Sequence, residues 1–415
     1  MDIFKQGQEE AIALLRQCMC EYGFLASPSK SANYRRVWSR DGVILGLAAL
    51  MTDDAELIKA FGNTLKTLAS HQGPHGEIPS NVDPTADRIS YGSTTGRVDA
   101  DLWFVIGCGE YWKKTGDDNF LDKMLRPIER VRFLLGAWEF NARGLLYVPQ
   151  TGDWADEYIH NGYVLYDQLL YLQVLRTLCE IREYLHGSED HRLKEKRTRL
   201  KQLIQANYWF EESAEEPEHV YHKILYEKGK QAAKRSRASY WMAFFTPHGY
   251  GYRFDAFANI LVSLLDVSDD VQRERVDQYI DTELRHDKTT LLPAFHPVIT
   301  PIDSDWKDIH MTFSYTFKNR PHEYHNGGRW PMLSGFYVAD LVKRGKTELA
   351  RRYLEDIHQS NAMEMNDSPW SFPEYIHGEK LKPGGKQFQG WSAAGALIAH
   401  YAIEGVPLFR ITLSG

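Results

Sequence analysis

Apolar residues recur at helical spacing from one end of the chain to the other, whereas the alternation typical of a half-buried strand is scarce. The periodicity predicts twelve helices, with ends that such patterns define to within a few residues. They are expected near residues 2–20, 41–51, 53–70, 99–114, 119–138, 165–186, 190–210, 252–266, 270–285, 329–344, 346–360 and 388–403. The pattern therefore predicts an all-α fold.

The links between these helices alternate between two kinds. Every second helix follows a segment rich in glycine, aspartate, arginine and aromatic residues, whereas the other links are short and merely polar. The motif-bearing segments are 34–42, 91–103, 151–163, 246–257, 323–332 and 371–395. Six helical hairpins around one axis would bring all six segments to the same end, where converging loops form binding sites. We therefore expect an (α/α)6 barrel.

Two longer connections interrupt this regularity. Residues 211–250 begin acidic and turn basic, which is typical of a solvated excursion or of a lid over the pocket. Residues 286–325 contain too much proline for a regular helix. Because no low-complexity linker divides the chain, a single catalytic domain over residues 1–415 is expected.

The composition of the chain indicates which kinds of partner and which cell compartment to expect. The net charge of −7 argues against nucleic acid or an anionic membrane as the main partner, and no apolar run is long enough to span a bilayer. The first twenty residues follow a helical pattern rather than that of a signal peptide. The four cysteines have neither disulfide nor zinc spacing, so reduced thiols and a cytoplasmic location are expected. Aromatic residues make up 13% of the chain, which suits either core filling or a pocket that stacks on sugars.

Several familiar catalytic motifs are missing from the sequence. It has no dinucleotide fingerprint, phosphate-binding loop, His-Glu-x-x-His element or Gly-x-Ser-x-Gly elbow. His248, His325 and His377 occur in motif segments but lack the spacing of metal ligands. Neither a cofactor nor a metal is therefore expected.

Carboxylates are the ionisable groups that recur in the motif segments. Cleavage of a glycosidic bond needs two of them, one to protonate the departing oxygen and one to activate water or attack the sugar. Asp41 and Asp99 also suit a helix N-terminus, and Asp255 has Arg253 as an adjacent partner, so each has a structural alternative.

Two segments concentrate this chemistry. In TGDWADEY, three acids surround Trp154, and in WSFPEY, Glu374 lies among aromatic residues. An apolar wall is one device that raises the pKa of a carboxyl group into the range of a working acid. The residues alone leave open whether both segments are catalytic, and whether Asp153 or Asp156 would be the acid.

The run from residue 315 to 400 resembles the alkaline/neutral invertase family. It contains TFKNRPHEYHNGGRWPML, WSFPEY and GKQFQGWSAAG in the family's order, followed by an apolar last helix. Upstream, SRDG, GRVDADLW and KKTGD resemble further family elements, so the resemblance covers about residues 33–403. VDADLW and DWADE also show a more distant likeness to glycogen-debranching glucosidases. Both groups are helical barrels, so the resemblance implies the same fold.

The resemblance also implies roles for individual residues. The family's general acid corresponds to Asp156 and its general base to Glu374. The expected substrate-binding residues, from these motifs and the other motif segments, are Trp38, Arg40, Asp41, Arg97, Asp99, Asp101, Trp154, Tyr324, His325, Asn326, Trp330, Tyr375 and Trp391. We expect Trp154 to keep Asp156 protonated near neutral pH, with Glu374 ionised.

The substrate part of the pattern departs from the family. After the catalytic acid the family has Arg-Arg and then Gly-His-Pro-Leu-Glu, where this chain has EYIHNGYVLYD. Asp101 also replaces a small residue of the family's Val-Asp element. The expected activity is therefore inverting hydrolysis of an α-glucosidic bond in sucrose, a related disaccharide or a short oligosaccharide.

Two other functions stay open at this stage. One is a sugar isomerase or epimerase on the same barrel, although such enzymes typically work through paired histidines. The other is a sugar-binding homologue without turnover, which the presence of both Asp156 and Glu374 disfavours. The expected partner is a small carbohydrate, and whether the chain forms a homo-oligomer is left open.

Overall fold

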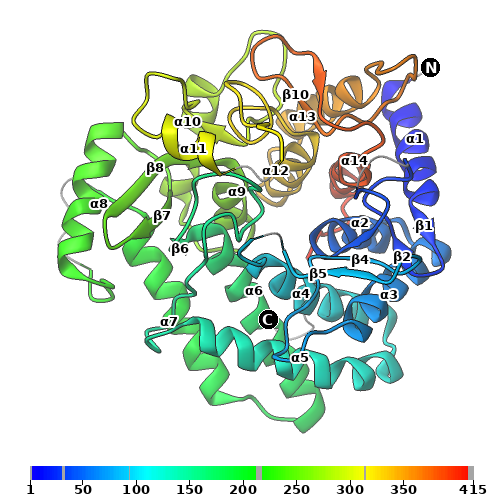
Figure 1. Cartoon of the computed structure of the whole chain (residues 1–415), viewed down its shortest axis with the longest axis horizontal. Helices are drawn as coiled ribbons and strands as arrows, with labels where there is room; N and C mark the ends of the chain where they lie inside the picture. The colour runs from blue at the N-terminus through cyan, green and yellow to red at the C-terminus, as the bar shows by residue number, and fades with distance from the viewer. Residues whose placement is uncertain (1, 30–32, 93, 212–216, 313–314, 410–415) are drawn as a thin grey trace.

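Twelve helices of the computed structural model form two concentric rings within the part of the chain that it describes, residues 2–29, 33–92, 94–211, 217–312 and 315–409. The inner ring consists of α2 (Ser39–Thr52), α4 (Val98–Thr115), α6 (Leu165–His186), α9 (Ala256–Leu264), α12 (Pro331–Lys343) and α14 (Gly390–Ile403). Each inner helix contacts the next, and α14 contacts α2, so the ring is closed (Figure 1). The all-α barrel expected from the sequence is confirmed.

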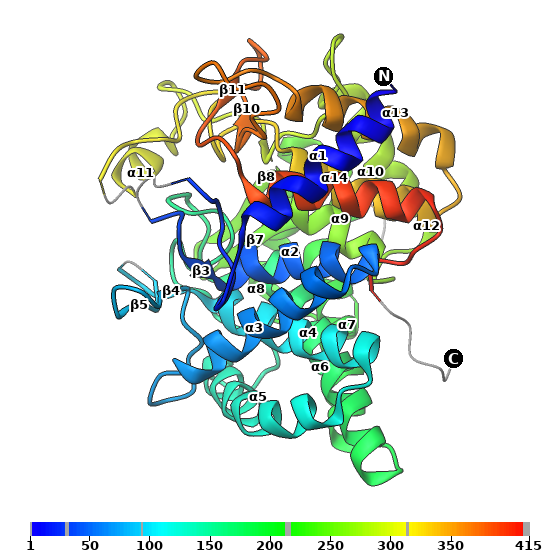
Figure 2. The ribbon, with the colours of Figure 1, turned by 90° about the vertical axis from the view of Figure 1, so that its right-hand side faces the viewer.

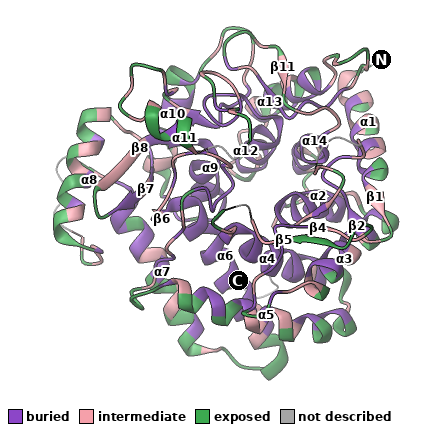
Figure 3. Cartoon of the chain, in the orientation of Figure 1, coloured by how far each residue is buried: buried purple, intermediate pink, exposed green. Residues whose placement is uncertain are grey.

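The outer ring covers the inner one. It consists of α1 (Ile3–Gln17), α3 (Ala55–Ser70), α5 (Asp118–Trp138), α7 (His191–Tyr208), α10 (Asp270–Glu283) and α13 (Thr347–Asn361). Inner helices such as α2 and α14 are buried around nearly their whole circumference, whereas the outer helices carry one apolar stripe (Figure 3). This difference is what the two hydrophobic patterns predict.

The two rings begin their helices differently. Aspartate side chains cap the outer helices α3, α5, α7 and α10, through Asp54, Asp117, Asp190 and Asp269. The inner helices α2, α4, α6, α12 and α14 lack a side-chain cap and start directly from the motif segments. Their N-termini, the positive ends of the helix dipoles, therefore point toward the motif-bearing end of the barrel, where they favour negative charge.

Short β-strands lie in the loops at the motif-bearing end of the barrel. They form two-stranded sheets of β1 (Met19–Cys20) with β2 (Gly23–Phe24) and of β10 (Tyr375–Ile376) with β11 (Pro383–Gly384), and a three-stranded sheet of β3 (Val37–Trp38), β4 (Asn81–Asp83) and β5 (Arg88–Ser90). A four-stranded antiparallel sheet joins β6 (Tyr163–Val164), β7 (Met242–Thr246), β8 (Gly249–Asp255) and β9 (Phe295–His296). Figure 2 shows β3, β4, β5 and α11 (Trp306–Met311) on one side of the helix rings.

The two long connections hold most of what the sequence pattern did not predict. Residues 211–255 contain α8 (Lys223–Ser236) and the β7–β8 hairpin, and residues 212–216 lie outside the described part. The helix expected at 252–266 begins only at Ala256, because the residues before it pair with β7 and β9. The connection at 286–325 contains the single short helix α11 in its described part, which excludes residues 313–314.

None of the described helices is both long enough and apolar enough to cross a membrane.

Glycines allow the backbones of two neighbouring inner helices, α12 and α14, to pack against each other. A Cβ atom on Gly335 of α12 would lie 2.2 Å from the carbonyl oxygen of Gly395 in α14. We predict that Gly335→Ala destabilises the protein by about 1–3 kcal/mol, because the two backbones would have to separate. Denaturant-induced unfolding measures the change.

The matched control is Gly136→Ala on the exposed face of α5, where an added Cβ meets nothing within 4 Å. That change should stabilise the protein by about 0.5–1 kcal/mol through helix propensity. A Gly335→Ala protein as stable as Gly136→Ala would contradict close packing of α12 on α14.

Candidate active site

A cavity of about 810 Å³ opens where the motif segments converge. Five of the segments contribute to it, those that precede α2, α4, α6, α12 and α14. Of the residues expected at the site, the cavity is lined by Trp38, Arg97, Asp156, Tyr324, Glu374 and Tyr375. Two carboxyl groups separated by more than two hundred residues of sequence therefore face the same space.

Two arginines hold Asp156. Its Oδ1 atom lies 3.0 Å from Nη2 of Arg97 and 3.5 Å from Nη2 of Arg40, and its Oδ2 atom accepts no hydrogen bond from the described residues. Burial by itself would raise the pKa of Asp156, but Arg97 and then Arg40 lower it, and the net pKa lies below the ordinary value.

Glu374 has a different environment. The hydroxyl of Tyr34 donates to its Oε1 atom at 2.8 Å, and the backbone N–H of Lys386 donates to its Oε2 atom at 3.1 Å. Burial raises the pKa of Glu374 more than these donors and Lys318 lower it, so the net pKa lies above the ordinary value. Asp156 adds to the rise, which indicates that the two carboxyl groups interact.

The expected order of protonation differs from the one that the surrounding charges favour. Trp154 was expected to keep Asp156 protonated, but its ring is fully buried and packs against Phe295 and His325. The charges of Arg97 and Arg40 dominate the environment of Asp156 instead. Both arginines were expected to bind substrate, and both are ion-pair partners of Asp156.

A buried layer beneath the cavity positions these groups. Arg40 is 6% exposed and donates to Oδ2 of Asp99 at 2.7 Å, and its guanidinium lies 6.0 Å from the ring of Trp391. Tyr166 donates to the same Asp99 oxygen at 3.4 Å. Arg40, Asp99 and Trp391 are thus placed to orient Asp156 from below, and none of the three lines the cavity.

Asp101 and Asn326, expected at the site, use their side chains for backbone contacts elsewhere. Asp101 accepts the N–H of Ile78, and Asn326 exchanges two hydrogen bonds with the backbone of Ile299. The expectation of sugar contacts for Asp101 and Asn326 came from motif position, which does not reveal such remote partners.

Trp330 and His325 form an aromatic floor under the cavity. Trp330 is fully buried and donates through Nε1 to the backbone oxygen of Tyr324 at 3.1 Å. His325 stacks on Trp330 with ring centroids 4.9 Å apart, and neither of its ring nitrogens has a hydrogen-bond partner among the described residues. Burial lowers the pKa of His325 well below its ordinary value, so this ring is neutral.

The side chain of Asp153, the alternative candidate for the general acid, points into the protein interior. It is fully buried, pairs with Nδ1 of His160 at 3.0 Å and accepts the N–H of Ala155. It does not line the cavity, so its geometry favours a role in shaping the loop that carries Asp156.

Three lining residues that act on Glu374 were not among the residues expected at the site. Tyr34 lies in the first motif segment and bonds Glu374, while Lys318 and Lys386 lie in the two family-like motifs and face the same cavity. Their positions in those motifs were the available signal. Within the described residues no group of three His, Cys, Asp or Glu side chains is arranged to hold a metal ion.

Comparison with known proteins identifies the family to which the chain belongs. A family model described as alkaline and neutral invertase matches residues 11–405. The chain belongs to this family. Alkaline/neutral invertase E of Arabidopsis thaliana, a chloroplastic protein, is 24% identical over 95% of this chain and 72% of its own length. Cytosolic invertase 1 of Oryza sativa subsp. japonica is 24% identical over 90% of this chain and 72% of its own length.

Solved structures support the same fold. A GH63 mannosylglycerate hydrolase from Thermus thermophilus superimposes with a TM-score of 0.65 at 14% identity, covering 94% of this chain and 99% of its own. A bacterial glucoamylase in complex with acarbose gives a TM-score of 0.65 at 14% identity, covering 98% of this chain and 57% of its own. As a member of the alkaline and neutral invertase family, the chain is a glycoside hydrolase.

Asp41 gives this invertase-family site a pH-dependent effect on stability. Its side chain lies in the first turn of α2, and burial raises its pKa to about 7, with Asp156 and Glu374 adding to the rise. The folded protein therefore keeps a proton on Asp41 that the unfolded chain releases at about pH 3.9. The stability that this difference contributes is present below about pH 4 and is lost as the pH rises to about 7.

We predict that Asp41→Asn raises the thermal stability relative to the native chain, by a margin that widens from about pH 4 to about pH 7 and is constant above. Thermal unfolding at several pH values measures the margin. Asp270→Asn, at a side chain that is 91% exposed, is the control and should show no such trend. A margin that is the same at pH 4 and pH 8 would contradict the raised pKa.

Proposed function

We propose that the chain hydrolyses an α-glucosidic bond in sucrose, a related disaccharide or a short oligosaccharide, with inversion at the anomeric carbon. One observation carries the proposal: Asp156 and Glu374, from two different motif segments, line one cavity together with aromatic residues. Two such carboxyl groups are what general acid–base cleavage of a glycosidic bond requires. The invertases of plants to which the chain is related support the choice of substrate class.

Asp156 acts as the general acid in this proposal. Arg97 and Arg40 occupy its Oδ1 atom, which leaves Oδ2 to carry the proton to the glycosidic oxygen. As the proton leaves, negative charge develops on Asp156 next to two fixed guanidinium groups. The arginines therefore stabilise the transition state more than the protonated ground state, and this difference accelerates the reaction.

Glu374 acts as the general base. Both of its oxygens accept hydrogen bonds, from the hydroxyl of Tyr34 and the N–H of Lys386, an arrangement that suits a carboxylate. The same contacts fix its orientation toward a water molecule on the face of the sugar opposite the leaving group. Because burial raises its pKa, the ionised form is also a stronger base than an exposed glutamate.

The pKa shifts of the two carboxyl groups favour a second assignment of roles. The pKa of Asp156 is lowered and that of Glu374 is raised, so these surroundings favour a proton on Glu374 over one on Asp156. In that alternative Glu374 would be the acid and Asp156 the base. We keep Asp156 as the acid because the family motif and the free Oδ2 atom agree on it, and the variants below discriminate the two assignments.

We place the protein in the cytosol. Cys18, Cys20, Cys108 and Cys179 are free thiols, which a reducing compartment preserves. The rice relative is cytosolic by name, although the Arabidopsis relative is chloroplastic.

Incubation with a panel of disaccharides tests the reaction. Sucrose, maltose, trehalose and isomaltose are to be followed by proton NMR during the first minutes of hydrolysis. The proposal expects β-glucose as the first form of the glucosyl unit that is attacked, because inversion exchanges its anomeric configuration. Initial release of α-glucose from sucrose, whose leaving group is fructose, would instead establish retention, and rearrangement without hydrolysis would favour the isomerase alternative.

We predict that the two carboxyl groups respond differently to the quality of the leaving group. Asp156→Asn should slow sucrose hydrolysis on the order of 10²–10⁴-fold but spare α-glucosyl fluoride, whose leaving group needs little protonation. Glu374→Gln should slow both substrates alike, because water activation is needed for each. Steady-state kinetics on the two substrates measures the ratio.

The opposite pattern, with fluoride hydrolysis spared only in Glu374→Gln, would reverse the two roles. Asp153→Asn provides a further check, since this residue pairs with His160 rather than lining the cavity. If Asp153→Asn abolished hydrolysis and Asp156→Asn did not, the assignment of the acid would be wrong.

Tyr34→Phe should shift the pH profile of the reaction. The tyrosine hydroxyl stabilises ionised Glu374, so its removal raises the pKa of that group. A hydrogen bond to a charged group of about 1.5 kcal/mol corresponds to roughly one pH unit. The acidic limb of kcat/KM should move upward by that amount, while the rate on the plateau is largely kept. An unshifted acidic limb would contradict Glu374 as the base.

A further inference from the structure

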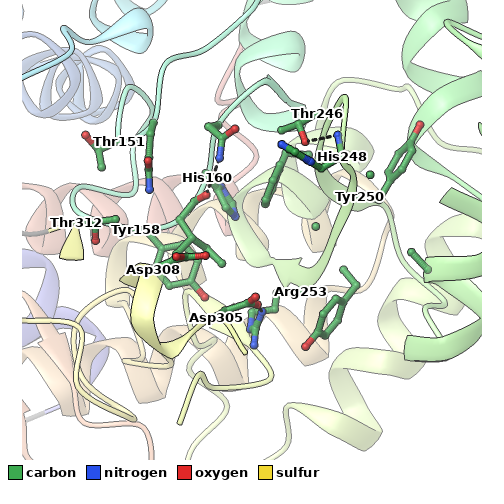
Figure 4. Close-up of a pocket in the computed structure, with 18 of the residues that line it drawn as sticks. Thr151, Tyr158, His160, Thr246, His248, Tyr250, Arg253, Asp305, Asp308 and Thr312 are labelled. Atoms are coloured by element: carbon green, nitrogen blue, oxygen red, sulfur yellow. Dashed lines mark hydrogen bonds and ion pairs between the residues drawn. The ribbon is translucent and has the colours of Figure 1, made fainter. Parts of the chain in front are cut away.

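A second and larger cavity lies beside the catalytic one. Its volume is about 1340 Å³, and its walls come from the loop 150–161, helix α8, the β7–β8 hairpin and helix α11. Figure 4 shows Thr151 and Thr312 on one side of this cavity and Tyr250 on the other. Neither Asp156 nor Glu374 lines it, so hydrolysis itself gives it no role.

The two cavities share a wall. Asp156 and Glu157 line the catalytic cavity, whereas the next residues of the same loop, 158–161, line the second one. The hydroxyl of Thr312 and the amide of Asn319 both donate to the backbone oxygen of Glu157 and fix this wall in place. Tyr315 lines both cavities and is 93% exposed at their common rim.

This geometry relates the second cavity to the leaving group. A general acid contacts the glycosidic oxygen, so the part of the substrate that departs extends past the acid. Past Asp156 along its own loop lies the second cavity. If the leaving group of a substrate is longer than one sugar unit, its distal units would therefore extend into the second cavity.

The lining suits a carbohydrate. Phe244, Tyr250 and Tyr252 of the hairpin are half-buried and contribute apolar surface next to polar groups. The hydroxyl of Tyr158, a fully buried residue of the wall, has no hydrogen-bond partner among the described residues. A buried hydroxyl without a partner is costly and is satisfied when a ligand hydroxyl bonds it.

The charges of the lining favour a neutral ligand over an anion. Three cations, Lys228, Arg235 and Arg253, face two carboxylates, Asp305 and Asp308. Arg253 is paired with Asp305, and Lys228 is directed at the backbone oxygens of residues 247 and 248. Three cations against two carboxylates leave a formal excess of a single positive charge in the lining.

We infer that the second cavity binds the distal sugar units of a neutral oligosaccharide whose terminal α-glucosyl unit occupies the catalytic cavity. The inference rests on the proposed function and specifies its substrate class: a glycoside with a leaving group of two or more sugar units.

Two substrate series test this subsite. Sucrose, 1-kestose and nystose form one series, and maltose, maltotriose and maltotetraose form the other; each added unit extends the leaving-group side. The wild type should show a KM that falls with length in the series that it hydrolyses. Tyr158→Phe should raise KM for the longest substrate about 2–10-fold, the effect of one hydrogen bond, without lowering thermal stability.

Gln231→Trp provides a steric test. Gln231 is exposed on α8 and faces the second cavity, so a tryptophan there would narrow it. The longest substrate should lose affinity while the disaccharide keeps its kinetics. Gln359→Trp, at an exposed position of the outer helix α13, is the matched control and should change neither.

The outcomes separate the inference from the proposed function. If the wild type hydrolyses disaccharides but KM does not depend on length, or if Gln231→Trp slows all lengths equally, the subsite is refuted while the proposed function stands. If the wild type hydrolyses neither series and neither trehalose nor isomaltose, the proposed function fails and the inference fails with it. If it hydrolyses only trehalose or isomaltose, the inference alone is refuted.

Discussion

The two ion pairs of Arg40, with Asp99 and with Asp156, hold together the end of the barrel that carries the proposed active site. Arg40 is almost fully buried and joins Asp99 of α4 to Asp156 of the following motif segment, while it belongs itself to α2. A buried charge of this kind is tolerated only when it is paired, and removal of one partner leaves the others uncompensated. Three successive hairpins of the inner ring are therefore tied together at the point where the reaction is proposed to occur.

The same constraint explains why acidic residues gather at this end. Five of the six inner helices, all but α9, start without side-chain caps, so their N-termini supply partial positive charge to the loops. Asp41, Asp99, Asp101 and Asp167 all lie in first turns of these helices and are buried. Burial raises the pKa of each of them, whereas the pKa of Asp156 is lowered because two guanidinium groups contact it. Asp156 differs from Asp99 in two ways: both guanidinium groups contact it, and its side chain is 21% exposed against 1% for Asp99.

Much of this architecture was predictable from the sequence, because each inner and outer helix has its own hydrophobic period and each motif segment precedes an inner helix. The strands before α9 were not, since Phe254 and Phe257 satisfy a helical period although only the second lies in the helix. At the site, the motifs placed Asp156 and Glu374 in one cavity. They could not reveal that Asp101 bonds Ile78, because that contact depends on how distant segments pack.

The closed ring of helices also determines where residues can be inserted into the chain. Every inner helix contacts both of its neighbours, so added residues cannot enter the ring without breaking it, whereas the loops at the catalytic end are free to grow. The two longest connections, on either side of α9 and α10, supply α8, the β7–β8 hairpin and α11, and these elements wall the second cavity. The ring thus fixes the two carboxyl groups, while the long connections shape the space beyond Asp156 that a leaving group would enter.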